Sequence, residues 1–333
     1  MSPYFSLIIP VYNRPVEVQE LLESLQKQTY SKPYEIVLVE DGSTERCEAV
    51  IETYGKGLQV SYYYKANSGP GDSRNYGMAR AKGNYFIVLD SDCILPPHYL
   101  EAAETALEND FVHCFGGPDA AHESFSDVQK AINYVMTSFL TTGGIRGGKT
   151  QLDKFQPRSF NMGISKEAFE ATGGFGNIHP GEDPDLSFRI WKKGYDSKLF
   201  REVFVYHKRR IDWAKFEVQV KKFGMVRPIL NRWHPSTAKI TYWFPSVFII
   251  GLFIAIIAAF FGFWFVLAGY TLYFLLLFID ALLKTNSPKI ASMALFATWV
   301  QFYGYGTGFL KSNFLLTFSK QEPEVLFPKL FFK

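Results

Sequence analysis

Two aspartates follow a short apolar run. The run 85–89 is typical of a buried strand, and Asp90-Ser91-Asp92 comes directly after it. Carboxylates at positions i and i+2 just past a strand can face one site and hold a hard cation such as Mg²⁺ or Mn²⁺ through their oxygens. An acidic pair in a turn is more often a solvated cap, so the pair alone is weak evidence for a metal site.

Two further side chains are candidates for proton transfer or metal binding. Asp183 lies in Glu182-Asp183-Pro184. It is either the N-cap of a helix with proline at the first helical position, or a general base at the start of that helix. His207 ends an expected strand. A lone histidine is more often packed or solvated, and the alternative is an imidazole ligand to the metal.

Strand and helix patterns alternate along the part of the chain that must position these side chains. Apolar runs predict strands, and apolar residues at helical spacing predict helices between them. The expected strands are 5–11, 35–39, 58–64 and 85–89, and the expected helices are 15–28, 44–54 and 70–81. This alternation predicts an α/β domain with a mostly parallel, doubly wound sheet.

Polar clusters fall where three of these strands end, at 12–14, 40–43 and 90–92. Ligands bind at the carboxyl ends of the strands in such sheets. We therefore expect the three clusters to lie together. Farther along, the expected elements are helices at 126–140 and 184–193, strands at 160–165 and 198–206, and an amphipathic helix at 213–223 lying on a membrane surface.

The composition changes after the first 210 of the 333 residues. Residues 240–279 contain no Asp, Glu, Lys or Arg, a length sufficient for two membrane spans of roughly 20 residues each. A third uncharged run covers 290–310. A buried helical core is the alternative, but three such runs in succession favour insertion into a membrane. The expected division is a catalytic domain at 1–210, a basic interfacial segment at 211–239, two to three transmembrane helices at 240–311 and a tail at 312–333.

The apolar run at the beginning of the sequence is too short for a secretory signal and lacks a basic start. The first domain is therefore expected on the cytoplasmic side of the inner (plasma) membrane. The segment 208–239 carries nine Lys or Arg against Asp212 and Glu217, which fits the positive-inside rule and contact with anionic membrane lipid. A nucleic-acid patch is the competing interpretation, and the adjoining apolar runs disfavour it. The three cysteines, at wide spacing, predict neither a disulfide framework nor a zinc site.

Five motifs in this order resemble the family 2 glycosyltransferases of GT-A fold, over about residues 5–210. They are the segments 8–14, 39–43, 67–77, 89–92 and 181–186. The resemblance implies an inverting transferase that uses a nucleotide-sugar donor, most simply a UDP-sugar, and Mg²⁺ or Mn²⁺. Physical chemistry agrees, because sugar transfer needs a stabilised diphosphate leaving group and a deprotonated acceptor hydroxyl.

The resemblance also implies roles for individual residues. Asp41 matches the acidic residue that hydrogen-bonds the uracil edge, and Asp183 matches the general base. Asp92 matches the direct metal ligand. The remaining donor-side matches are Pro10, Tyr12 and Arg14 near the nucleotide, Glu40 beside Asp41, Arg74 near the base or diphosphate, Asp90 near ribose and metal, and His207 near metal and diphosphate. The positions assigned to the acceptor or diphosphate side are Glu182, Asn161, Gln219 and Lys222.

Comparison with two groups of enzymes within this family bears on the number of sugars transferred and on the acceptor. Processive synthases of the family carry Gln-x-x-Arg-Trp, where this chain has Gln219, Lys222 and Phe223. Lysine lacks the fork of arginine, so a single-sugar transferase is favoured over a polysaccharide synthase. Polyprenyl-phosphate sugar synthases need no base, so the pair Glu182-Asp183 favours a hydroxyl acceptor on a lipid-linked sugar or glycan. A scaffold that binds nucleotide sugar without turnover would have no need of the carboxylates.

Overall fold

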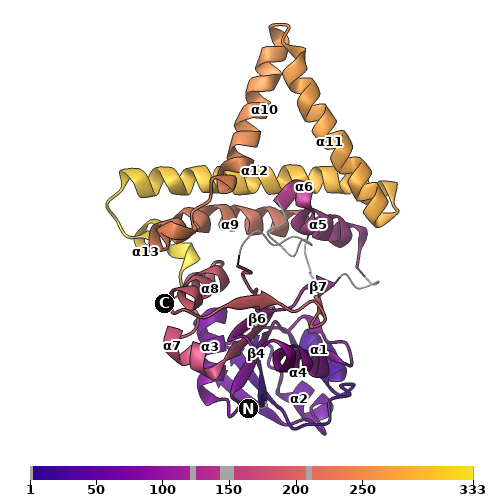
Figure 1. Ribbon diagram of the computed structural model, residues 1–333, viewed down its shortest axis with the longest axis vertical. Helices are drawn as coiled ribbons and strands as arrows, with labels where there is room; N and C mark the ends of the chain where they lie inside the picture. The colour runs from indigo at the N-terminus through magenta and orange to yellow at the C-terminus, as the bar shows by residue number, and fades with distance from the viewer. Residues whose placement is uncertain (1–2, 121–124, 143–153, 208–211, 333) are drawn as a thin grey trace. The chain divides into compact units, whose positions relative to one another are not determined.

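The computed structural model describes residues 3–120, 125–142, 154–207 and 212–332. The chain divides into two compact units (Figure 1). The sheet unit comprises 1–122, 152–208 and 331–333, and the helical unit comprises 123–151 and 209–330. This division differs from the expected one, because residues 123–151 belong to the helical unit and residues 331–333 belong to the sheet unit. The expected boundary between 210 and 211 lies outside the described residues.

The sheet unit is built on a seven-stranded sheet of order β3-β2-β1-β4-β8-β6-β9. The strands are β1 (Phe5–Val11), β2 (Glu35–Asp41), β3 (Val60–Lys65), β4 (Tyr85–Leu89), β6 (Cys114–Gly116), β8 (Asn161–Ser165) and β9 (Ser197–Leu199). Strand β8 is antiparallel to both neighbours, and the other pairs are parallel. The prediction of a mostly parallel sheet is therefore confirmed.

A second, three-stranded sheet has the order β5-β10-β7. Its strands are β5 (Cys93–Ile94), β7 (Asp119–Ala120) and β10 (Val205–His207). The single strand expected at 198–206 is therefore two strands, β9 and β10, which belong to different sheets. Strand β10 pairs His207 with Cys93, so the chain returns beside the Asp90–Asp92 segment.

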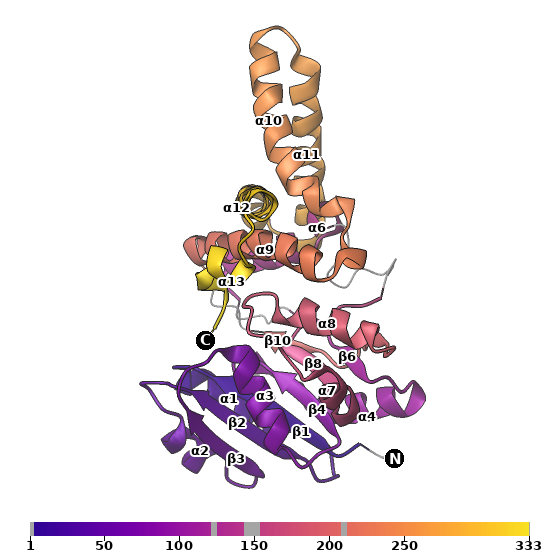
Figure 2. The same ribbon diagram turned by 90° about the vertical axis from the view of Figure 1, so that its left-hand side faces the viewer.

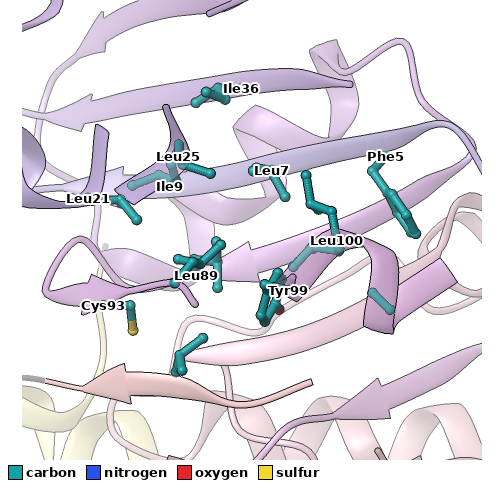
Figure 3. Close-up of a cluster of buried hydrophobic side chains, with 14 of the residues drawn as sticks. Phe5, Leu7, Ile9, Leu21, Leu25, Ile36, Leu89, Cys93, Tyr99 and Leu100 are labelled. Atoms are coloured by element: carbon teal, nitrogen blue, oxygen red, sulfur yellow. The ribbon is translucent and has the colours of Figure 1, made fainter. Parts of the chain in front are cut away.

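Helices cover both faces of the large sheet. Because side chains alternate along a strand, Leu7 and Ile9 of β1 enter one apolar cluster and Ile8 enters the other. The first cluster includes Leu21 and Tyr99 (Figure 3). The helices on that face are α1 (Pro15–Leu25), α2 (Glu48–Tyr54) and α4 (Tyr99–Asn109). The opposite face carries α3 (Pro70–Arg80), α7 (Lys166–Thr172) and α8 (Glu182–Lys192).

The helical unit holds the remaining helices (Figure 2). They are α5 (Asp127–Thr137), α6 (Phe139–Thr142), α9 (Trp213–Trp233), α10 (Phe244–Phe260), α11 (Trp264–Thr285), α12 (Pro288–Phe318) and α13 (Pro323–Leu326), with short 3₁₀ turns at Pro235–Thr237, Ile240–Trp243 and Pro328–Leu330. Among the described residues two helical stretches are long and apolar enough to cross a membrane, Ile240–Phe260 and Trp264–Thr285. The expected third uncharged run lies within α12, which is not one of them.

Helix α12 packs closely along α9. Glycines make the approach possible: a Cβ on Gly224 would lie 2.1 Å from the Tyr305 carbonyl oxygen, and one on Gly308 would lie 2.4 Å from the Lys221 carbonyl oxygen. Phe216 is fully buried in the same cluster as Ala294 of α12. The apolar side of the expected membrane-surface helix is therefore covered around Phe216 by helix α12.

Candidate functional site

Asn13 ties together the loops that follow β1 and β2. Its side-chain oxygen accepts hydrogen bonds from the Thr44 and Glu45 amides, at 2.8 and 3.0 Å, and its own amide donates to the Ser43 hydroxyl at 2.8 Å. Asn13 adopts a left-handed conformation with φ 52°, which asparagine tolerates better than most residues. The neighbouring Tyr12 is 54% exposed, so its ring is free to contact a ligand at this edge.

Asp41 holds the loop that leads into α3. Its carboxylate accepts hydrogen bonds from the Lys65 ammonium at 2.7 Å and from the Ser68 and Gly69 amides at 3.0 and 2.9 Å. A carboxylate has about four acceptor positions, so about one is left for a ligand such as a base N–H. Glu40 and Asp41 are both buried, but the Glu40 carboxylate accepts from other partners, the Cys47 amide and the Tyr62 hydroxyl. Glu40 therefore anchors α2 and β3 from inside the protein.

Asp90 and Asp92 are separated by a turn after β4 and face different partners. The Cys93 amide donates to the Asp90 carbonyl at 3.1 Å, which closes the turn. The Asp90 carboxylate accepts from Arg74 at 2.9 Å, whereas that of Asp92 accepts from Arg14 at 2.9 Å. The sequence placed all four side chains in one site, and the structure brings them to one edge of the sheet. Pro10 is half-buried in β1, opposite Val39 of β2 and near the carboxyl end of both strands.

Asp92 and His207 form the best candidate metal site in the described part of the chain. His207 Nε2 lies 3.1 Å from a carboxylate oxygen of Asp92, and Cys93 completes a group of three possible ligands. Burial raises the pKa of the Cys93 thiol well above its ordinary value, and the charges of Asp92 and Asp90 raise it further. A neutral thiol is a poor ligand for a hard cation. The donor set is therefore carboxylate and imidazole, which suits a divalent cation that also takes phosphate oxygens.

Asp183 is the second residue of α8. That helix begins at Glu182 with Gly181 as its N-cap, so of the two interpretations of Asp183 the N-cap is wrong. The Asp183 carboxylate accepts a hydrogen bond from the Ser159 hydroxyl at 3.3 Å, and an Arg158 nitrogen lies 3.9 Å away. Burial raises the pKa of Asp183, and the negative charge of Glu182 raises it further, against the opposing effect of Arg158 and Arg74.

Glu182 binds two cationic partners in the interior. Arg74 donates to its carboxylate at 3.0 Å, and His179 Nδ1 lies 2.9 Å from the same oxygen. Burial alone would raise the pKa of Glu182, but His179 and Arg74 lower it to about 2. The same ion pair raises the pKa of His179 although burial opposes it. Arg74 thus links Asp90 to the start of α8, a bridge that the sequence did not predict.

Asn161, assigned to the acceptor or diphosphate side, does not contact these groups. Asn161 is fully buried, where its amide donates to the Val203 carbonyl at 2.7 Å and accepts from the Tyr99 hydroxyl. It therefore stabilises the core of the sheet unit. Gln219 and Lys222 lie on α9 in the helical unit.

Four side chains that contact these groups were not expected from the sequence: Lys65, Arg158, Ser159 and His179. Of these, only His179 could have been suspected from the sequence, because it lies close to the Glu182-Asp183 pair. Arg158 and Ser159 lie on a segment outside helices and strands, whose course no periodicity predicts, and Lys65 is the last residue of β3.

The family model described as "Glycosyl transferase family 2" matches residues 6–173. An uncharacterized glycosyltransferase of Rickettsia typhi is 41% identical over 100 residues, which are 30% of this chain and 30% of that protein. The poly(ribitol-phosphate) beta-N-acetylglucosaminyltransferase TarS of Staphylococcus aureus is 35% identical over 107 residues, which are 31% of this chain and 19% of that protein. The chain thus spans less than a third of the length of these two relatives.

A solved structure supports the same fold. The mannosyltransferase PcManGT from Pyrobaculum calidifontis, in complex with GDP-Man and Mn²⁺, has a TM-score of 0.58 at 15% identity, over 96% of this chain and 89% of that one. At this identity the likeness shows the fold alone, and it confirms the expected fold class. Since the family model also matches half of the sequence, from β1 through α7, this chain belongs to glycosyl transferase family 2.

Proposed function

We propose that this protein transfers one sugar, with inversion, from a nucleoside-diphosphate sugar to a hydroxyl group of a lipid-linked or glycan acceptor. The observation that carries the proposal is the pair of unlike carboxylates at the start of α8. Glu182 is held ionised by Arg74 and His179, while the pKa of Asp183 is raised. Neighbouring carboxylates with pKa values pushed apart are a frequent feature of acid–base sites.

Asp183 is the proposed general base. A raised pKa makes this carboxylate a better proton acceptor than an ordinary surface aspartate. The Ser159 hydroxyl orients the Asp183 carboxylate by donating a hydrogen bond to it at 3.3 Å. In the proposed reaction Asp183 takes the proton of the acceptor hydroxyl, whose oxygen attacks the anomeric carbon from the face opposite the diphosphate. The bond to the diphosphate breaks with its electron pair, so the configuration inverts without a covalent sugar–enzyme intermediate.

The donor side is assigned to the loops at the carboxyl edge. Asp41 has about one free acceptor position for a base N–H, and the exposed Tyr12 ring offers a stacking face. These contacts suit any base with an N–H group, and we assign a UDP-sugar because Asp41 matches the family residue that hydrogen-bonds the uracil edge. The competing donor is a GDP-sugar, since PcManGT was solved with GDP-Man.

Asp92 and His207 are the residues that would hold the divalent cation, with Asp90 close to it. When bound, Mg²⁺ or Mn²⁺ would act as a Lewis acid that neutralises the diphosphate leaving group. Arg14, whose guanidinium is 2.9 Å from Asp92, orients that carboxylate from the β1 loop. Arg74 does the same for Asp90 from α3.

The two apolar helices α10 and α11 are proposed to cross the membrane as a hairpin. Their side chains are exposed along much of their length, including Phe253, Phe260 and Phe265. The pairing of Phe331 with Ile178 supports an even number of crossings, because it requires residue 331 to lie on the same side as the sheet unit. Helix α12 then stays on that side, which is the cytoplasmic side if the basic segment 208–239 follows the positive-inside rule.

A screen of nucleotide sugars tests the proposed reaction. The purified full chain in detergent is given UDP-, GDP- and ADP-sugars with a lipid-linked glycan acceptor, and release of the nucleoside diphosphate is measured with Mg²⁺, Mn²⁺ or EDTA. We expect metal-dependent release with a UDP-sugar that increases when acceptor is added. No release from any nucleotide sugar would contradict the proposal, and transfer to bare polyprenyl phosphate would assign the phosphate-acceptor reaction instead.

A further inference from the structure

The backbone of residues 331–332 binds the backbone of the loop that precedes α8. Phe331 pairs with Ile178 in an antiparallel bridge, and the Phe332 amide donates to the Asn177 carbonyl at 3.0 Å. These residues follow the helical unit in the sequence but belong to the sheet unit by their contacts. The chain therefore passes through all of α9 to α13 before it returns to the loop that carries the catalytic candidates.

The Phe332 ring packs on the loop that binds Asp41. A Cβ placed on Gly69 would lie 2.4 Å from two ring carbons of Phe332, so the ring fits because residue 69 has no side chain. Gly69 also has a φ of 93°, which glycine adopts readily, and its amide donates to Asp41 at 2.9 Å. On its other side the Phe332 ring meets the His179 ring, with centroids 6.0 Å apart.

These contacts form a continuous chain between the two halves of the site. Gly69 binds Asp41 on the donor side, and His179 lies 2.9 Å from Glu182 on the base side. Phe332 touches both Gly69 and His179. Arg74 of α3 also reaches Glu182 at the start of α8, and Asn75 exchanges two hydrogen bonds of 2.8 Å with the Phe175 backbone. Helix α3 is therefore joined to the segment leading into α8 at several points, and Phe332 links the Gly69 end of α3 to His179.

We propose that Phe332 is a positioning residue of the donor site, which closes its rim between the Asp41 loop and the His179–Glu182 pair. The proposal rests on the function proposed above, because the ligand it serves is the nucleoside diphosphate. The half-buried ring holds the Gly69 loop in place, so that the Asp41 carboxylate stays oriented toward the nucleobase of the donor. It also packs against His179, whose contact with Glu182 sets the charge next to Asp183.

The experiment compares UDP binding and turnover in the full-length protein and three variants. Phe332→Ala removes the ring, and Phe332→Tyr keeps it. Phe111→Ala removes a 59% exposed ring at the opposite, amino end of β6 and serves as the matched control. Calorimetry with UDP and Mn²⁺ gives the Kd, steady-state assays give KM and kcat, and thermal unfolding checks that each variant is folded.

We expect Phe332→Ala to raise the Kd for UDP and the KM for the donor about tenfold, which is the size of one lost aromatic contact. The tyrosine variant should restore both to within about twofold, and the control should match the wild type. Unchanged Kd and KM in Phe332→Ala would overturn the proposal. A tyrosine variant as weak as the alanine variant would also overturn it. Failure of the wild type to bind UDP would instead count against the UDP donor, so the two failures are distinguishable.

Discussion

Replacement of Glu182 by glutamine probes the charged network at the start of α8. Glutamine has nearly the size of glutamate and resembles its protonated form, so the variant removes one buried charge and little else. Arg74 and His179 both lose an ionic partner at hydrogen-bond distance. Asp183 loses the adjacent negative charge that helps to raise its pKa.

The size of the effect on stability follows from the pKa of Glu182. The fall from 4.5 to about 2 corresponds to about 3 kcal/mol that favours the ionised form in the folded protein. Because the folded pKa is the lower one, this stability is present above about pH 4.5 and is lost as the pH falls toward 2. Glu182→Gln should therefore unfold about 6–12 °C lower at pH 7, and the difference should shrink below pH 4.5.

Two measurements check this prediction. Thermal unfolding of both proteins is followed from pH 3 to 7, with Glu48→Gln as control, since the Glu48 side chain is 51% exposed and its surface pair with Arg46 contributes about 1 kcal/mol or less. The acidic limb of kcat/KM should move to lower pH in Glu182→Gln, because removal of the neighbouring charge lowers the pKa of Asp183. Equal unfolding temperatures at pH 7, or an acidic limb that moves upward, would refute the reasoning.

Three further predictions concern the metal ligand, the choice of nucleotide and the membrane topology. Asp92→Asn replaces a carboxylate ligand by a neutral amide, so calorimetry should find that metal no longer strengthens UDP binding; an unchanged metal dependence would exclude Asp92 as a ligand. UDP should bind at least tenfold better than GDP or ADP, because a site that hydrogen-bonds one base leaves buried groups unpaired with another, and equal affinities would remove the assignment of Asp41. In cells, an impermeant thiol reagent should label Phe261→Cys at the hairpin tip but neither Lys215→Cys nor Lys320→Cys; labelling at 215 or 320 would overturn the two-span topology.

The sequence was most informative where backbone periodicity decides the structure. Strands β1 and β4 have the expected bounds, because short apolar runs between turn residues leave few alternatives. Helix α4 was not expected, although its apolar residues pack in the first cluster. Two to three spans were expected, and the run within α12 is not among the two helical stretches of the described residues that are apolar enough to cross a membrane; its glycines instead pack against α9.

The site was predictable in its residue types but not in its connections. Motif order selected Asp41, Asp92 and Asp183 as candidates, and the structure brings their strand and helix ends to one edge of the sheet. The role of Asn161 as a core residue depends on partners from distant segments, which one sequence does not reveal. For the same reason no spacing pattern could connect Phe332 with Gly69.

The most direct test of the account is the turnover and the UDP affinity of Asp183→Asn, measured side by side. The asparagine oxygen can still accept the Ser159 hydrogen bond, so the fold and the donor site should persist. It cannot take a proton from the acceptor, and loss of a general base typically slows a reaction about 10²–10⁴-fold. We predict that UDP binds with its wild-type Kd while sugar transfer falls by that factor. Wild-type turnover in Asp183→Asn would contradict the assignment of Asp183 as the base.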